Sequence, residues 1–198
     1  MSTYEFVSPV QPTFGNAKAI QSLTLQDLKA GKFDNPTSLA NPDELSKVLA
    51  QEGKLAEYPD RYNGYAHEDG SLVAFSKTNE WFAGDEAPFI DSIIARKALV
   101  ARSKLRGGSL SPKEYGIFGL VASDELPSND RNDILHDLLN RALGEAAMQT
   151  MLNVNIVLHE FDPVLNIARD LGFKPKGSGE AAGAPGLFQH RYQYTIDD

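Results

Sequence analysis

The chain has 198 residues, of which 41% are hydrophobic and 23% are charged, and it contains no cysteine. This length and apolar content are typical of one domain with an ordinary buried core, so we expect a single domain over residues 1–198. A formal charge of -8 repels polyanions, and we therefore expect no nucleic-acid partner. The lack of cysteine excludes disulfides, thiol catalysis and thiolate metal sites.

No stretch of the sequence is long enough to cross a bilayer. The apolar run from Ile117 to Ala122 is far shorter than the roughly 20 residues that a spanning helix needs. Residues Met1 to Phe6 lack a basic start followed by an apolar block, which is the pattern of a secretory signal. We expect no membrane partner and a cytoplasmic location.

The first part of the chain predicts a strand, two helices and a hairpin. Tyr4 to Val7 alternates polar and apolar side chains, as a short strand does. Apolar residues at helical spacing predict one helix from Asn16 to Leu28 and a second from Pro42 to Leu55. Tyr62 to His67 and Leu72 to Ser76 then predict two antiparallel strands, because Glu68-Asp69-Gly70-Ser71 between them is typical of a hairpin turn.

The middle of the chain predicts two helices around a buried strand. Ile90 to Leu105 fits a basic amphipathic helix, whose charges either meet an anionic partner or form a solvated face. Tyr115 to Ala122 is nearly continuously apolar, as in a central strand covered on both faces, and its two glycines indicate close approach by another group. A long helix is predicted after Pro127-Ser128 and runs to about Met151.

The last part predicts two more strands around a short helix and a loop. Val154 to Leu158 is a second buried strand, and Pro163 opens a helix that ends before Gly172. Gly177 to Gly186 is predicted to be a flexible loop, and Phe188 to Ile196 a closing strand.

This order of elements resembles the GNAT superfamily of acyl-CoA-dependent N-acyltransferases over nearly the whole chain. The most specific piece runs from Asp162-Pro163 to Leu171-Gly172-Phe173, and is similar to the family's short helix that ends in Gly-Phe after the fifth strand. The resemblance implies an α/β fold with a central mixed sheet of about six to seven strands flanked by helices. It also implies that the strands at Tyr115–Asp124 and Val154–Glu160 run parallel and splay apart around the acyl-CoA arm.

The same resemblance implies that acetyl-CoA, as co-substrate, binds with its pyrophosphate at the start of the long helix, where unpaired amides favour anions. The residues implied are Leu126, Arg131, Asn132, Asp133, Ile134 and Leu135, together with Asp162 near the family's usual asparagine. Asp133 and Leu135 stand where the family has glycines. A carboxylate beside a diphosphate costs about 1 to 3 kcal/mol at surface-like dielectric, which Arg131 offsets in part. Alternatively, Asp130 and Asp133 only cap and charge-match their own helix.

Three residues are candidates for proton transfer, namely Glu125, His159 and Tyr192. His159-Glu160 ends a buried strand near the expected entry of the amine; alternatively, this pair faces solvent or caps the next helix. Glu125 ends the other central strand. Tyr192 is a substitute for the family's acidic tyrosine, whose place Ala168 holds, although alternating tyrosines also pack against sheet faces. The histidines lack ligand-like spacing, so we expect no metal site.

Three interpretations stay open. The first is an acyl-CoA-dependent N-acyltransferase that moves an acetyl group to an amine of a small molecule or protein, by proximity and by backbone polarisation of the thioester. The alternative is a non-catalytic module with the GNAT fold that binds a ligand or a protein, which the departures at Asp133, Leu135 and Ala168 favour. The third is an unrelated α/β domain with the same element order. The sequence leaves the assembly open, including a homodimer.

Overall fold

Seven strands form one mixed sheet in a computed structural model that describes residues 4–31, 53–81, 114–180 and 188–196. The strands are β1 (Tyr4–Val7), β2 (Tyr62–His67), β3 (Leu72–Glu80), β4 (Glu114–Ala122), β5 (Asn153–His159), β6 (Lys174–Glu180) and β7 (Phe188–Thr195). Their order across the sheet is β1-β2-β3-β4-β5-β7-β6, and only β4 and β5 pair in parallel.

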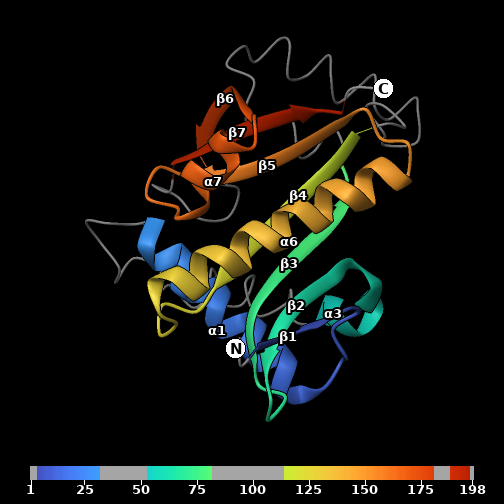
Figure 1. Ribbon diagram of the computed structural model, residues 1–198, viewed down its shortest axis with the longest axis vertical. Helices are drawn as coiled ribbons and strands as arrows, with labels where there is room; N and C mark the ends of the chain where they lie inside the picture. Colours follow the sequence, from blue (N-terminus) through green and yellow to red (C-terminus); the bar gives the residue numbers. More distant parts are fainter. Residues whose placement is uncertain (1–3, 32–52, 82–113, 181–187, 197–198) are drawn as a thin grey trace.

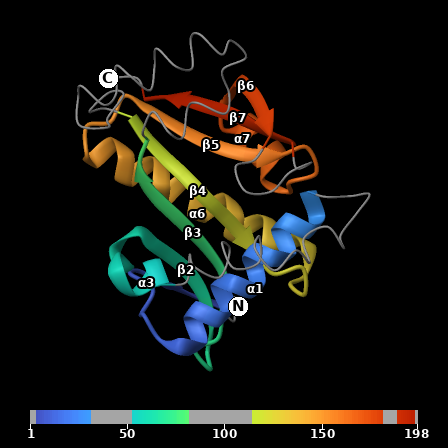
Figure 2. The same cartoon turned by 180° about the vertical axis from the view of Figure 1, so that it is seen from behind.

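Helices cover both faces of this sheet. The described helices are α1 (Phe14–Gly31), α3 (Gly53–Glu57), the short 3-10 turn η2 (Pro59–Arg61), α6 (Ser128–Met148) and α7 (Val164–Asp170). Helices α6 and α7 lie across one face (Figure 1), and α1 lies across the other, as the view from behind shows (Figure 2). None of the helices in the described ranges is long and apolar enough to span a membrane.

Most of the elements expected from the sequence are confirmed, including the hairpin, both central strands and the long helix. One expectation is wrong in part, because Gly177 to Glu180 belongs to β6 and not to a loop. Backbone pairing with β7, from Lys174 with Gln193 to Glu180 with Phe188, makes this glycine-containing segment a strand. Residues 181–187, the start of the helix predicted from Pro42 and the basic helix predicted from Ile90 lie outside the described residues.

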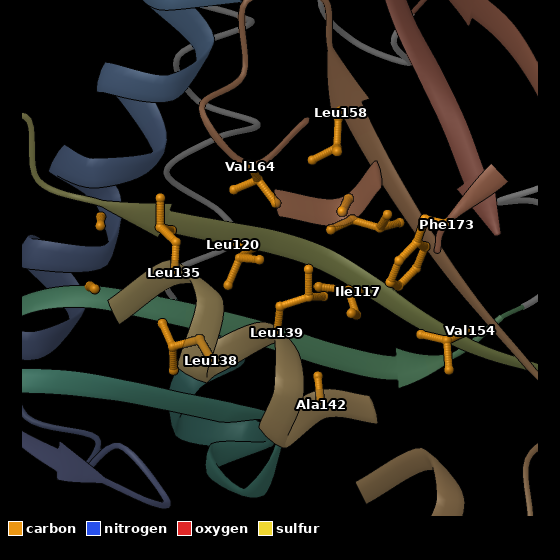
Figure 3. Close-up of a cluster of buried hydrophobic side chains, with 14 of the residues drawn as sticks. Ile117, Leu120, Leu135, Leu138, Leu139, Ala142, Val154, Leu158, Val164 and Phe173 are labelled. Carbon is orange, nitrogen blue, oxygen red and sulfur yellow. The ribbon is translucent and has the colours of Figure 1, made fainter. Parts of the chain in front are cut away.

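The main core lies between α6 and the central strands. Leu135, Leu138, Leu139 and Ala142 of α6 recur at intervals of three and four residues, so they share one face of the helix. Figure 3 shows these side chains pointing toward Ile117, Leu120, Val154, Leu158, Val164 and Phe173. A smaller cluster on the opposite face joins α1 to β3 and β4 through Ile20, Leu23, Phe75 and Val121.

The two glycines of β4 are needed because aromatic rings lie against the strand. A Cβ at Gly116 would lie 2.6 Å from the Phe118 ring and 2.9 Å from the Trp81 ring, which is too close. A Cβ at Gly119 would lie 3.1 Å from the Phe75 ring. The close approach predicted from the sequence is therefore confirmed, and the approaching groups are the chain's own side chains.

Candidate functional site

The strands β4 and β5 are paired at one end and separated at the other. Their pairing runs from Glu114 with Asn153 to Ile117 with Ile156. Five residues of β4 and three of β5 continue beyond the last pair, as far as Ala122 and His159. Figure 1 shows the two strands diverging toward the start of α6. A gap therefore opens between the carboxyl ends of two parallel strands, a usual position for ligands in α/β proteins.

A β-bulge marks the point at which the strands separate. Phe118 has no partner on β3, because Lys77 pairs with Gly119 and Thr78 with Ile117. An extra residue of this kind bends its strand, and this one directly follows the last pair with β5.

Past the bulge, backbone groups of β4 face the gap. Ser123 donates its N–H to Val73 O on β3, and alternate residues of a strand turn their amides to opposite edges. The N–H and C=O of Leu120 and Ala122 therefore point away from β3. Within the part of the chain that the structure describes, the backbone of Leu120 has no partner on this side.

Helix α1 joins the two separated strand ends through consecutive residues. Gln26 Nε2 donates to Ala122 O at 3.2 Å, and the N–H of Asp124 donates to Gln26 Oε1 at 3.3 Å. The side-chain amide of Gln26 thus takes the place of a neighbouring strand beside the end of β4. Asp27 contacts the other strand, with its Oδ1 at 3.1 Å from His159 Nε2.

His159 lies in a cluster built from three elements. Its ring is 2% exposed, and its Nε2 is 3.1 Å from Asp27 Oδ1 and 3.9 Å from Asp162 Oδ2. Asp162 precedes α7, where its Oδ1 accepts the N–H of Val164 at 2.8 Å. The alternative in which His159 faces solvent is therefore wrong, because only Glu160 of the pair is exposed.

The hydrogen bond to Asp27 sets the tautomer of the His159 ring. A carboxylate only accepts hydrogen bonds, so the proton of the neutral ring lies on Nε2 and the lone pair lies on Nδ1. Nδ1 is buried and has no hydrogen-bond partner among the described residues. A buried acceptor without a partner is costly, so a proton donor placed beside this nitrogen would be stabilising.

The charges of the cluster perturb two pKa values. Burial disfavours the charged form of His159, but the hydrogen bond to Asp27 and the charges of Asp27, Asp162 and Glu160 outweigh it and raise the pKa. Burial, followed by the charge of Asp27, raises the pKa of Asp162 to about 7, although the N–H of Val164 and His159 oppose this. Asp162 therefore titrates close to neutral pH, as groups that transfer protons often do.

The start of α6 offers unpaired amides, one turn earlier than the sequence suggested. The first helical hydrogen bond runs from the N–H of Arg131 to Pro127 O, which leaves the N–H groups of Ser128, Asn129 and Asp130 without helical partners. The amides of Asn132 and Asp133 lie inside the helix, and their side chains are exposed.

Three other predicted cofactor residues are core residues. The side chains of Leu126, Ile134 and Leu135 pack in the main core and not at the surface of the helix start. Arg131 lies in the first turn, and its Nε is buried with no partner among the described residues. Among the described residues at the start of α6, Arg131 Nε is therefore a buried donor that lacks a partner. Asp130 and Asp133 make no capping hydrogen bond to α6.

The remaining predicted residues lie apart from the His159 cluster. Tyr192 pairs with Ile156, three residues before His159, so the two side chains point to opposite faces of the sheet. Tyr192 is buried in the main core, and its hydroxyl accepts from Arg169 Nη2 at 3.3 Å. Ala168 is buried in the same core. Glu125 is exposed in the turn after β4, and its side chain makes no hydrogen bond or ion pair among the described residues.

Sequence reasoning missed Gln26 and Asp27. The signal was present in α1, because Asp27 follows Ile20 and Leu23 at a helical spacing of seven and four residues and so continues their buried stripe. A carboxylate on such a stripe indicates a buried polar partner. That partner, His159, is 132 residues away, so local patterns give no hint of which residue it is.

Solved structures with a similar fold are known. The chain is similar to a candidate acetyltransferase of the GNAT family from Desulfovibrio desulfuricans, with 8% identity over 97% of this chain and 98% of that one and a TM-score of 0.59. It is similar to Ard1 from Thermoplasma volcanium (14% identity, 100% of both chains, TM-score 0.58) and to aminoglycoside 6'-acetyltransferase type Ii (13% identity, 100% and 99%, TM-score 0.54). No family model and no curated protein matches the sequence. These likenesses show that the chain has the GNAT fold.

Proposed function

We propose that this protein is an acyl-CoA-dependent N-acyltransferase that moves an acetyl group from acetyl-CoA to an amine in the gap between β4 and β5. The observation that carries the proposal is the position of His159. Its ring lies at the end of β5 beside the gap, on the face of α1, with one nitrogen tied to Asp27 and the other without a partner among the described residues. This is the arrangement expected of a general base.

The reaction uses groups that the described residues supply. The amine nitrogen attacks the thioester carbon while His159 Nδ1 takes a proton from the amine, and Asp27 stabilises the imidazolium that forms. The N–H of Leu120 faces the gap and is the candidate donor to the thioester oxygen as negative charge develops there. The C–S bond then breaks, and the CoA thiolate leaves and is protonated.

The start of α6 is the proposed site for the pyrophosphate of acetyl-CoA. The unpaired amides of Ser128 to Asp130 and the dipole of α6 favour an anion, and the unpartnered Nε of Arg131 supplies a positive charge beside them. Asp130 and Asp133 oppose such binding electrostatically. Arg131 is therefore the side chain whose charge attracts the pyrophosphate at this helix start.

A titration tests the proposal. We expect purified protein to bind acetyl-CoA and CoA with a Kd of about 1 to 100 µM, and Arg131→Ala to weaken both by about tenfold, as loss of one charge-assisted contact predicts. Lys176→Ala is the control, because this exposed residue on β6 removes the same charge away from the helix start. A thiol-release assay with a panel of primary amines then tests for transfer.

The second candidate function is a non-catalytic module with the GNAT fold. The burial of Ala168 favours it, because the side chain that stands in for the family's acid is an apolar part of the core. The same titration distinguishes the two functions. Absence of binding at millimolar acetyl-CoA would contradict the enzyme and leave the binding module.

A further inference from the structure

We propose that Asp27, His159 and Asp162 form a binding site for one first-row divalent transition-metal ion. One donor atom from each residue lies within 4.8 Å of the other two. The donors come from α1, from the end of β5 and from the turn before α7. Asp27 is therefore far in sequence from His159 and Asp162. The distance along the chain explains why histidine spacing alone gave no indication of a metal.

One carboxylate oxygen of Asp162 faces this cluster and accepts no hydrogen bond from the described residues. The side chain of Asp162 is 6% exposed, and its Oδ1 is already held by the N–H of Val164. Its Oδ2 faces His159 Nε2 at 3.9 Å, beyond hydrogen-bond distance, and accepts no other hydrogen bond from the described residues. The bond to Val164 fixes the orientation of the carboxylate, as outer contacts commonly do for metal ligands.

The charge of the cluster favours a cation. Two carboxylates share one imidazole, and no lysine or arginine in the described ranges forms an ion pair with either aspartate. Carboxylates that lack a counter-charge are costly to bury, and a divalent ion neutralises both at once. The separations of 3.1 and 3.9 Å are close to the roughly 3.3 Å between ligands that each lie about 2 Å from a tetrahedral zinc ion.

The donor set indicates the class of ion. One imidazole nitrogen with two carboxylate oxygens suits Zn²⁺, Co²⁺ or Mn²⁺, whereas Ca²⁺ and Mg²⁺ take oxygen ligands alone. The side chain of Asp27 is 28% exposed, so an ion can enter from its side. Three protein ligands leave at least one coordination position for water or another ligand.

Metal binding and general-base catalysis exclude each other at His159. An ion on Nε2 displaces the proton that bonds Asp27, and the neutral ring then carries its proton on Nδ1, which can no longer accept one. The bound ion would therefore inhibit acyl transfer. The metal site itself does not depend on the proposed function, because the three donors are present whether or not the protein binds acetyl-CoA.

Direct binding of metal to the full chain tests this site. After treatment with a chelator and its removal, the protein is titrated with ZnCl₂ by calorimetry, and CoCl₂ is followed by visible absorption. We expect one ion per chain, d–d absorption bands from Co²⁺, and binding weakened at least about tenfold in Asp27→Asn and in Asp162→Asn. Asparagine keeps an oxygen that can accept the N–H of Val164, so Asp162→Asn retains the start of α7.

Asp124→Asn is the matched control, because this exposed carboxylate lies beside Gln26 at the same end of the sheet but outside the cluster. Saturable binding that survives both Asp27→Asn and Asp162→Asn would assign the ion to other groups and overturn the site. Absence of saturable zinc binding to the parent protein would overturn it as well. Titration with acetyl-CoA is read separately, so failure of one proposal does not decide the other.

Discussion

The two ends of the β4–β5 pair are held by different kinds of contact. At the paired end, backbone hydrogen bonds join the strands, and the core beneath α6 buries their side chains. At the open end the backbone pairing stops, and the side chains of Gln26 and Asp27 connect the strands through α1. Apolar burial thus fixes the fold, whereas a few polar contacts fix the candidate site.

The largest expected effect comes from removing the proposed base at the open end. His159→Gln keeps a polar side chain of similar size but cannot accept a proton, so kcat for acyl transfer should fall by about 10²- to 10⁴-fold. The KM for acetyl-CoA should change little, because the proposed pyrophosphate site lies at the start of α6. Steady-state kinetics with a responsive amine measure both constants.

His190→Gln provides the control for this change. His190 lies on β7 and pairs with Leu158 of β5. Leu158 directly precedes His159, so the side chains of His190 and His159 lie on opposite faces of the sheet. We expect its kcat to match that of the parent protein. Equal activity of His159→Gln and the parent would remove the general base from the mechanism.

Truncation in the core tests the paired end. Leu138 is fully buried in α6, and Leu138→Ala should lower the free energy of unfolding by about 2 to 5 kcal/mol through lost burial and the cavity left behind. Met148→Ala is the control, because Met148 is 80% exposed on the same helix and should cost less than about 0.5 kcal/mol. Urea unfolding gives both values. A small loss at Leu138 would contradict a fold fixed by this core.

The contrast between a fold held by apolar burial and a site held by polar contacts also explains what could be predicted from the sequence. The spacing of Leu135, Leu138 and Leu139 predicted α6, because burial of one helix face leaves a local pattern. The glycines at positions 116 and 119 correctly indicated close packing against β4. The segment Lys174–Glu180 was misjudged because backbone pairing to β7, and not apolar side chains, makes it a strand.

The candidate site was predictable only in fragments. His159 and Asp162 lie close in sequence at the end of β5, where the family resemblance directed attention. The partner of His159 on α1 and the bulge at Phe118 depend on how distant segments meet, which no local pattern records. The predicted phosphate residues Arg131 to Leu135 came from matching the family's glycines, whereas the amides without helical partners are those of Ser128 to Asp130.

A smaller effect is expected from the titration of Asp162. Its pKa is raised to about 7 in the folded protein, so between about pH 4 and pH 7 the folded state binds the proton more tightly than the unfolded chain. The free energy of unfolding should therefore fall as pH rises through this window. His159, whose pKa is also raised, contributes in the same direction, because its stabilisation is lost as pH rises through its folded pKa.

Asp162→Asn should reduce this pH dependence by on the order of 2 kcal/mol, since one pKa unit corresponds to about 1.4 kcal/mol and the site shares its charge with His159. Urea unfolding of both proteins at several pH values between 4 and 8 measures the difference. Asp170→Asn, an exposed change at the end of α7, should leave the pH dependence as in the parent protein. Parallel curves for the parent and Asp162→Asn would contradict the raised pKa.

The smallest expected effect is at Gln26, which tests whether side chains replace strand pairing at the open end. Gln26→Ala removes two hydrogen bonds to the end of β4, at Ala122 O and at the N–H of Asp124. One bond is part-buried and the other is exposed, so we expect a loss of about 1 kcal/mol in stability. Gln21→Ala, the same change earlier in α1, is the control, because the Gln21 side chain makes no hydrogen bond among the described residues. If Gln26→Ala also lowers kcat while leaving the binding of acetyl-CoA unchanged, then α1 positions β4 for the reaction as well as orienting His159. If stability and kcat both stay at the parent values, the bend at Phe118 alone holds the gap open, and the contacts of α1 serve His159 only.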